Sequence, residues 1–415
     1  MKSIFYLLSS LLVLVLNFSY GQESNITITA ENRYLDAPVY ATLQNIDYNS
    51  ATNYQLVEII NGEKSPPIDF QIEKGYPNRI WWILSGKTTK NEKRNFKLIP
   101  ISENKDVNSS LSFTKNDKHL TIYKNNTPVL QYNHALTPPP EGKSKLYTRS
   151  GYIHPIFTPD GFTLTTIHPE DHIHHMGLWN PWTKTEFEGR SLDFWNLNKG
   201  EGTIKFAEFV SHYSGPVFAG FQSLHKHIDL TAPTFKGSEV VLNEVWDVRV
   251  YKAGKSYTII DFVSYLNCNT ESSFTLKEYR YGGFGLRANQ FWTNKNSKVI
   301  TSAGKTREDA DASKARWAII SGSTPKGANA GIIFMSHPAN YQYPEPMRVW
   351  PPDANGGRGD VFFNFSPTRH TDWVLQPGQV YALRYRMVVF DGEMETSQAE
   401  QFWQNFTNQL MVAVE

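Results

Sequence analysis

The sequence predicts a mainly β protein, an antiparallel β-sandwich or an extended double sandwich, with a C-terminal helix. Two observations predict it. Short runs in which apolar and polar residues alternate dominate the chain beyond residue 21, whereas a helical period is found only near the C-terminus. Aromatic residues, which favour strands, are also abundant, with 25 Phe, 21 Tyr and 11 Trp among 415 residues.

The strands follow from the alternation, and the turns between them from glycine, asparagine and proline. Six of the clearest strand segments are residues 25–30, 57–60, 79–84, 120–123, 240–250 and 381–390. Turns are predicted at 61–62 (Asn-Gly), 125–126 (Asn-Asn) and 377–378 (Pro-Gly). The one amphipathic helix is predicted over 396–412, and its apolar face comprises Ala399, Phe402, Trp403, Phe406 and Leu410.

The chain divides into three parts. Residues 1–21 combine Lys2, an apolar run over 4–16 and small residues at Ser19 and Gly21, which is typical of a secretory signal peptide cut before Gln22. The stiff, polar segment 137–143 separates a smaller β lobe over 22–136 from a larger β-sandwich domain over 137–415. We therefore expect an exported protein, periplasmic or secreted, with no membrane span in the mature chain.

Charge and cysteine content narrow the function. The chain has 41 basic and 40 acidic residues, so no long-range electrostatic field favours a nucleic acid or a membrane surface as partner. An exported chain with a single cysteine, Cys268, forms no internal disulfide and depends on its core for stability. Because no reactive-cysteine pattern surrounds Cys268, we interpret it as a buried thiol at a strand end.

The chemistry is concentrated in one segment. Five of the twelve histidines lie within residues 154–175, where Asp-His-Ile-His-His-Met-Gly spans 171–177. Extended backbone would place His172 and His174 on one face and His175 on the other. Three interpretations stay open: a divalent metal on His172 and His174 with Asp171 or Glu170 in support, acid–base catalysis, or histidines that only hydrogen-bond the loop. The sequence does not establish a cofactor.

Aromatic and basic residues follow the histidines. Trp179, Trp182 and Trp195 are either core residues or a platform on which sugar rings stack. Residues 277–287 are strand-like and then glycine-rich, and they bring Tyr281, Arg280 and Arg287 together as a surface for carboxylate or sulfate, or else form a β-bulge. A long loop rich in proline and glycine over 336–360 is of the kind that lines or covers a site.

On these residues the chain resembles a known family. The run Tyr-Ile-His-Pro-Ile-Phe-Thr-Pro-Asp-Gly from residue 152, the histidine core, Asp193-Phe-Trp, Arg287 after Gly-Gly-Phe-Gly and the late segment 375–392 resemble the PmoA-like family over about 140–395. The resemblance implies a secreted protein of polysaccharide degradation, a lyase that acts as an oligosaccharide dehydratase in ulvan breakdown. Such an enzyme removes water from a terminal uronic acid and leaves a 4,5-unsaturated sugar. The family commonly has a cation after the His-His pair, where this chain has Met176.

The reaction that the resemblance implies needs a group for the carboxylate, a base and an acid, and residues of this chain fit these roles. Arg280 or Arg287 would bind the substrate carboxylate, with His172, Trp179 and Trp182 as further substrate contacts. His174 or His175 would take the proton from C5, and Tyr281 or the second histidine would protonate the leaving O4. The expected partner is thus an anionic oligosaccharide. Two other functions stay open: a glycoside hydrolase that pairs Glu170 or Asp171 with Asp193 or Glu278, and a non-catalytic sugar-binding protein.

Overall fold

The computed structural model describes residues 23–45, 52–102, 109–233, 237–408 and 410–414. It confirms the predicted fold class: strands dominate, every paired strand is antiparallel, and a helix lies near the C-terminus. The predicted signal peptide, 1–21, lies outside the described residues. Within those residues no helix combines the length and the apolar character that a membrane span requires.

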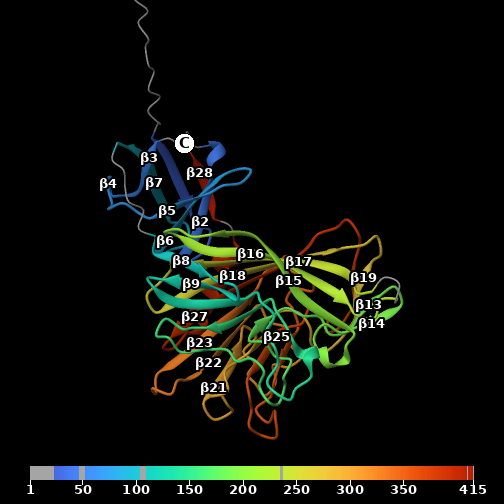
Figure 1. Cartoon of the computed structure of the whole chain (residues 1–415). Helices are drawn as coiled ribbons and strands as arrows, with labels where there is room; N and C mark the ends of the chain where they lie inside the picture. The colour runs from blue at the N-terminus through green and yellow to red at the C-terminus, as the bar shows by residue number, and fades with distance from the viewer. Residues whose placement is uncertain (1–22, 46–51, 103–108, 234–236, 409, 415) are drawn as a thin grey trace, which may run out of the picture.

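The smaller lobe is formed by two sheets that pack face to face, shown at the top of Figure 1. The first has the order β28-β1-β7-β3-β4, with bounds Met411–Val414, Ser24–Thr29, Lys93–Ile101, Asn53–Ile60 and Glu63–Lys64. The second has the order β2-β6-β5, with bounds Tyr34–Thr42, Arg79–Thr88 and Phe70–Glu73. Alternate residues of both sheets, such as Ile26, Leu98, Ile80 and Trp82, form the core between them.

The larger lobe is built on two eight-stranded sheets. The cavity-side sheet, so named here for the cavity described below, has the order β24-β25-β20-β12-β11-β10-β9-β8, with bounds Met347–Val349, Phe362–Phe365, Gly285–Arg287, Leu178–Trp179, Tyr152–Ile156, Thr127–Asn133, His119–Lys124 and Leu111–Lys115. The lobe-side sheet has the order β15-β16-β17-β18-β27-β23-β22-β21, with bounds Gly202–Tyr213, Phe218–Asp229, Glu239–Tyr251, Tyr257–Cys268, Tyr381–Asp391, Asn329–Ser336, Trp317–Ser323 and Ser297–Thr301.

Shorter elements complete the larger lobe. A four-stranded sheet has the order β14-β13-β19-β26, with bounds Arg190–Leu192, Thr185–Phe187, Phe274–Leu276 and Trp373–Leu375. Three single-turn 3₁₀ helices are η1 (Leu43–Asn45, in the smaller lobe), η2 (Lys145–Tyr147) and η3 (Leu197–Lys199). The helix α1 is Thr396–Thr407.

One continuous core fills the space between the two eight-stranded sheets. The cavity-side sheet contributes Ile153, Leu178, Leu286 and Phe363 to this core, among others. The lobe-side sheet contributes residues such as Phe221, Trp246, Phe262 and Ile332. Because side chains alternate along a strand, the residues next to these point to the outer faces of the sandwich. The outer faces are therefore where the loops, the helix and the smaller lobe attach.

The predicted C-terminal helix is confirmed over its first part and is too long at its end. Ala399, Phe402, Trp403 and Phe406 pack on the outer face of the lobe-side sheet, as the helical period predicts. The helix ends at Thr407, however, and Met411–Val414 forms β28 beside β1 in the smaller lobe. Leu410 and Val412 join the core of that lobe, because the apolar period changes there from helical to alternating.

The two cores do not divide at the predicted boundary after residue 136. Apart from the C-terminal strand, the residues that form the core of the smaller lobe end at Leu98, and those of the large core begin at Leu111. Strand β8 pairs with β9, β9 with β10 and β10 with β11, so the cavity-side sheet includes strands on both sides of residues 134–151. Alternation predicts a strand but carries no information about which sheet it joins.

The strand and turn predictions are confirmed except in one segment. All six strand segments are strands, and the turns at Asn61-Gly62 and Asn125-Asn126 have the positive φ angles that tight hairpins need. Cys268 is buried at the end of β18, and its thiol donates to the carbonyl of Leu375. The prediction of a strand over 277–281 is wrong: β19 ends at Leu276, and irregular chain leads to β20 at Gly285.

Gly177, which precedes β12, provides a test of this packing. A Cβ atom there would lie 2.6 Å from the carbonyl oxygen of Ile153, and its φ of +69° is left-handed. Gly161, with φ of +85°, would have nothing within 4 Å of an added Cβ atom and serves as the control. We expect Gly177→Ala to lower the free energy of unfolding by roughly 3 kcal/mol, from backbone strain plus overpacking. Gly161→Ala should cost about 1 kcal/mol from strain alone. Urea unfolding measures both, and equal losses would contradict the close approach.

Candidate functional site

A cavity of about 360 Å³ lies on the outer face of the cavity-side sheet. Its base is a hydrophobic, mainly aromatic cluster that packs on that face: Tyr152, Met176, Trp179, Trp195, Trp350 and Phe362. Trp179 and Phe362 point outward because their neighbours Leu178 and Phe363 point into the sandwich core. The same alternation turns Arg287 of β20 outward, next to the inward-facing Leu286.

The structure brings five of the predicted site residues to this cavity. His172, His174, His175, Arg280 and Tyr281 all line it. Residues that the sequence analysis did not single out complete the lining, and the main polar ones are Asn196, Arg348 and Asn355. Arg348 and Asn355 come from the loop over 336–360, which was predicted to line or cover a site.

The three histidines converge because their segment folds back on itself. Backbone hydrogen bonds join Thr166 to Gly177 and His168 to His175, and between them the chain makes tight turns at 169–175. The prediction that His175 lies opposite His172 and His174 is therefore wrong, because it assumed extended backbone. The ring centroids of His172 and His175 are 4.7 Å apart and those of His174 and His175 are 4.8 Å apart.

Arg287 holds this segment in place from below. Its guanidinium is 1% exposed and forms ion pairs with Asp171 at 2.8 Å and with Asp360 at 3.4 Å. It lies over the ring of Trp350, with 4.7 Å from Cζ to the centroid, and donates to Nδ1 of His175 at 3.4 Å. All of these partners belong to the protein, so Arg287 positions the site and is not a surface for substrate, which corrects its predicted substrate-binding role.

Asp171 and His172 form an oriented pair. Nδ1 of His172 lies 2.7 Å from Oδ2 of Asp171, which also accepts from Asn355 at 2.8 Å. Burial raises the pKa of Asp171, but the hydrogen bond from His172 and the charge of Arg287 outweigh it and lower the pKa below its ordinary value. An ionised carboxylate only accepts, so Nδ1 of His172 carries the proton. In the neutral ring, the lone pair is then on Nε2, as a general base requires.

His174 and His175 are held in the neutral form. Burial first, and then the charges of His172, Arg149 and Arg287, lower the pKa of His174 to about 4. Burial likewise lowers the pKa of His175 well below its ordinary value, with the charges of His174 and Arg287 adding to it. Because Arg287 donates to Nδ1 of His175, the neutral ring of His175 has its proton on Nε2 and acts as a donor.

Tyr281 and Arg280 line the cavity from the irregular chain between β19 and β20. The hydroxyl of Tyr281 is within 3.3 Å of the side-chain nitrogen of Asn196, and its ring lies 5.0 Å from that of Trp195. Burial raises the pKa of Tyr281, so the hydroxyl is protonated at neutral pH. Arg280 is exposed, its guanidinium lies 5.6 Å from the centroid of Tyr281, and it has no carboxylate partner among the described residues.

The predicted tryptophan platform is wrong for Trp179 and Trp182. Trp179 is 0% exposed and lies beneath His175, with the two ring centroids 5.2 Å apart. Trp182 is 1% exposed and belongs to the main core, where it packs against Trp373. Trp195 and Trp350 are the tryptophans that line the cavity. Which tryptophans are buried and which line the cavity depends on the alternation within the sheet and on a loop more than 150 residues away. A local sequence pattern shows neither.

The donor set does not converge as a metal site does. Among the residues that the structure describes, no group of three or more His, Cys, Asp or Glu side chains meets at one point. Nδ1 of His172 is engaged by Asp171, and Nδ1 of His175 by the guanidinium of Arg287. A carboxylate pair for glycoside hydrolysis is not formed at the cavity either: no Asp or Glu is among the described residues that line it, and Asp193 is 1% exposed and bound by Lys199 and Asn196.

Comparison with known proteins places the chain in a family. Residues 119–404, which include the histidine segment, Arg280, Arg287 and most of α1, match the family of unknown function DUF6807. The chain belongs to this family. No curated protein matches the chain in sequence.

Several crystal structures of sugar-active proteins are similar to this member of the family at low identity. A heparan sulfate lyase mutant from Pedobacter heparinus matches with 9% identity and a TM-score of 0.33, over 71% of this chain and 38% of the lyase. The GalM/aldose epimerase homologue from C. elegans matches with 11% identity and a TM-score of 0.33, over 69% of this chain and 100% of the epimerase homologue. The chain thus spans about two fifths of the length of the lyase. These values carry no statement about activity.

The neutral histidines predict a specific pH dependence. The pKa values of His154 and His174 are both lowered to about 4, chiefly by burial. Above pH 6.5 such rings are neutral in the folded and the unfolded chain, so they do not change stability. Between about pH 6.5 and pH 4 only the unfolded chain binds the protons, so the free energy of unfolding must fall as the pH falls.

We expect the ring resonances of His174 in NMR spectra to stay unchanged from pH 8 to pH 5. The denaturant midpoint should fall between pH 7 and pH 4.5, and it should fall less in His174→Gln, which lacks one of the depressed groups. Titration of His174 near its ordinary value would contradict the burial described here.

Proposed function

We propose that this protein is a carbohydrate-active lyase, a dehydratase that eliminates water from the terminal uronic acid of ulvan-type oligosaccharides. The observation that carries the proposal is the cavity itself: an oriented Asp171–His172 pair, a protonated Tyr281 and the exposed Arg280 meet in one pocket. The resemblance to the PmoA-like family, which implies this activity, supports it. The predicted signal peptide belongs to the same proposal, which places the enzyme outside the cytoplasm.

The reaction needs three functions, and the cavity offers a residue for each. The substrate carboxylate at C6 acidifies C5–H when its charge is neutralised, and Arg280 and Arg348 are the guanidiniums that line the cavity. Arg348 is already paired with Asp311 at 2.7 Å, whereas Arg280 has no such partner in the described chain. Arg280 is therefore the residue that we assign to the carboxylate, and it fills the role left open by Met176.

Proton transfer is assigned to His172 and Tyr281. Nε2 of His172 takes the proton from C5, the electron pair forms the C4=C5 double bond, and the C4–O4 bond breaks. The departing oxygen takes the phenolic proton of Tyr281 and leaves as water, after which the proton on His172 returns to the tyrosinate. His174, neutral at pH 7 and only partly buried, supplies hydrogen bonds to the sugar, whereas His175 is 2% exposed and supports the cavity from beneath. This assignment gives the base role to His172, where the sequence analysis had favoured His174 or His175.

The first experiment measures the new double bond. Oligosaccharides from ulvan with a saturated terminal uronate should gain ultraviolet absorbance and lose the mass of one water when the protein is added. His172→Ala should lower kcat/KM by about 100- to 10,000-fold, the usual share of a general base. His119→Ala is the matched control: His119 begins β9 of the cavity-side sheet and does not line the cavity, so this change should leave the rate unchanged. Release of reducing ends without absorbance would favour a hydrolase and contradict the proposal.

A second experiment separates the acid–base mechanism from a metal mechanism. The engaged Nδ1 atoms of His172 and His175 and the lack of a convergent third ligand within the described residues lead us to expect full activity after chelation and dialysis. Elemental analysis of the same sample reports the metal content. Loss of activity on chelation, restored by a divalent cation, would overturn the acid–base assignment.

A further inference from the structure

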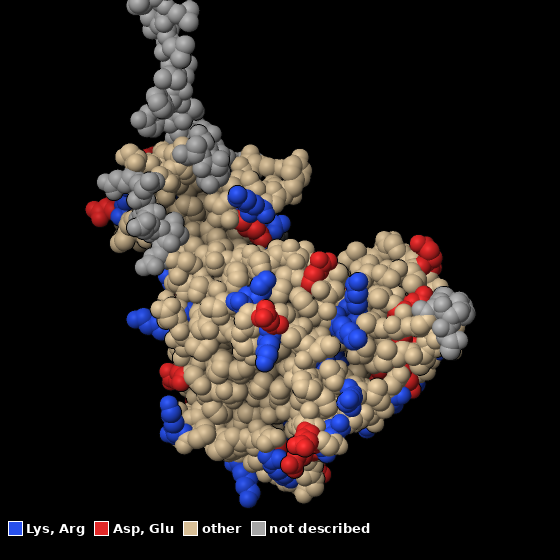
Figure 2. All heavy atoms as spheres, viewed as in Figure 1, with Lys and Arg blue, Asp and Glu red and all other residues tan. Residues whose placement is uncertain are grey.

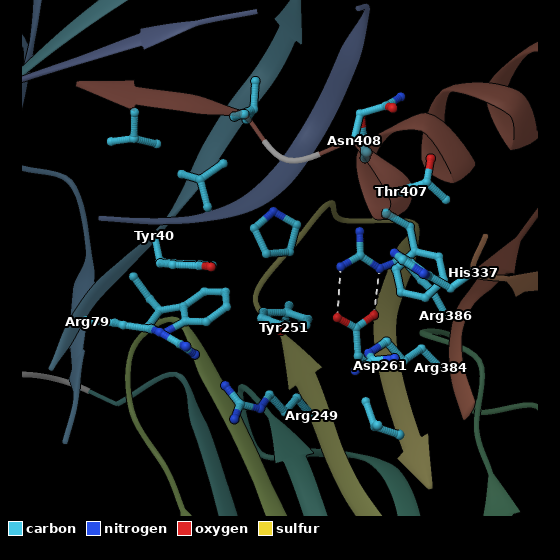
Figure 3. Close-up of a pocket in the computed structure, with 18 of the residues that line it drawn as sticks. Tyr40, Arg79, Arg249, Tyr251, Asp261, His337, Arg384, Arg386, Thr407 and Asn408 are labelled. Atoms are coloured by element: carbon cyan, nitrogen blue, oxygen red, sulfur yellow. Dashed lines mark hydrogen bonds and ion pairs between the residues drawn. The ribbon is translucent and has the colours of Figure 1, made fainter. Parts of the chain in front are cut away.

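A second cavity, of about 760 Å³, lies between the two lobes. It is bounded by β2 of the smaller lobe, by the outer face of β17, β18 and β27, and by the residues that follow α1. Figure 3 shows this cavity, with arginine and aromatic side chains around it. The histidine cavity lies on the opposite outer face of the sandwich, so the two cavities are separated by both eight-stranded sheets.

The strand register places charged residues on this face. Arg249 of β17 is directly opposite Asp261 of β18, and Asp261 is opposite Arg386 of β27. Elsewhere the same outer face is apolar and is covered by α1 and β6. The change from apolar to charged residues occurs where the sheet faces the cavity.

Guanidiniums outnumber carboxylates here. Four arginines line the cavity, Arg79, Arg249, Arg384 and Arg386, against the carboxylates of Asp247 and Asp261. Glu73, which is not part of the lining, pairs with Arg79 at 3.7 Å and with Arg249 at 2.7 Å, so Arg384 is the lining arginine that has no carboxylate partner in the described chain. Asp261 forms a bidentate ion pair with Arg386, with contacts of 2.6 and 2.8 Å, which Figure 3 shows as dashed lines. Asp247 is used by Arg249, with two contacts of 3.1 Å. Both acidic groups of the described lining are therefore engaged.

Several hydrogen-bond donors at this cavity have no acceptor among the described residues. The side chain of Arg384 makes no hydrogen bond or ion pair with the described residues. Nη1 of Arg386 is buried and has no hydrogen-bond partner in the same part of the chain. Nδ1 of His337 accepts from the backbone of Ala339, so the neutral ring carries its proton on Nε2 and is a further donor beside Arg384 and Arg386. Unpaired donors of this kind are complementary to an anion.

Aromatic rings line the same cavity. Tyr40 and Trp81 pack with their centroids 4.8 Å apart, and Arg79 lies over Tyr40 at 4.8 Å. Tyr251 and Tyr265 line the cavity from β17 and β18. Aromatic faces bind the C–H faces of sugar rings, while guanidiniums bind carboxylate or sulfate groups. The volume is also within the range of pockets that enclose a ligand of several rings.

We propose that the cavity between the lobes is a second, non-catalytic binding site for an acidic saccharide, whose carboxylate or sulfate group is bound by Arg384 and Nη1 of Arg386. The choice of a saccharide among anions rests on the proposed function, and the choice of an anion rests on the unpaired donors alone. The site holds a chain of the same chemical class as the substrate and takes no part in elimination.

Calorimetric binding of a sulfated uronate oligosaccharide to the full chain tests the proposal. Arg384→Gln removes a side chain that has no partner among the described residues, so the fold should not change, and we expect affinity for one class of sites to fall at least about 10-fold. Turnover of a disaccharide substrate should stay the same, because Arg384 is remote from the histidine cavity. Arg33→Gln, which removes an exposed arginine of the smaller lobe, is the control for loss of charge alone.

The outcomes separate this site from the proposed function. Binding that survives in His172→Ala but is lost in Arg384→Gln supports the second site, even where the wild type shows no turnover and the dehydratase proposal fails. An uncharged oligosaccharide should not bind at this site, and inorganic sulfate should compete for it. Equal affinities of Arg384→Gln and Arg33→Gln for the sulfated oligosaccharide would overturn the proposal.

Discussion

The ion pairs of Arg287 are the interaction on which the histidine cavity depends. This guanidinium belongs to β20, which lies between β25 and β12 in the cavity-side sheet, and it connects two loops that are far apart in the sequence. Asp171 belongs to the histidine segment, and Asp360 ends the loop that carries Trp350 and Asn355. Removal of one member of such a buried network leaves charges without partners, at a cost of about 3–5 kcal/mol. The position of His172 therefore depends on a residue that substrate does not reach.

A sheet with two buried faces explains why this arrangement is rigid. In β12, β20 and β25 one set of alternate residues fills the sandwich core and the other set forms the aromatic base of the cavity. The loops that carry the histidines pack on side chains whose strands are fixed from the other side. Burial by the same cluster excludes water from His174 and His175 and keeps them neutral, so the fold sets both the position and the protonation state of the site.

The sequence predicts the local part of this structure well, because local pattern determines it. Alternation locates the strands, asparagine and glycine locate the hairpin turns, and the density of histidines identifies the segment that forms the cavity. What it does not predict depends on contacts between distant segments. Arg348 and Asn355 join the cavity from a loop more than 170 residues from His172, and the burial of Trp179 is decided by strands that pair with its own. Our proposal assigns the base role to His172 instead of His174 because of one hydrogen bond to Asp171, which spacing alone does not show.

The charge balance of the chain affects how the anionic ligand that we propose would be found. Acidic and basic side chains are interspersed over a largely uncharged surface on the face shown in Figure 2, so attraction at long range is weak. Recognition then depends on cavities in which a few guanidiniums lie beside aromatic rings, and both cavities described here have that composition. Two packed sheets alone are about 10 Å apart, and loops and the smaller lobe add to that separation. A short oligosaccharide in the histidine cavity therefore cannot reach the cavity between the lobes. An occupant of the second site must be either a separate chain or a distant part of the same polymer.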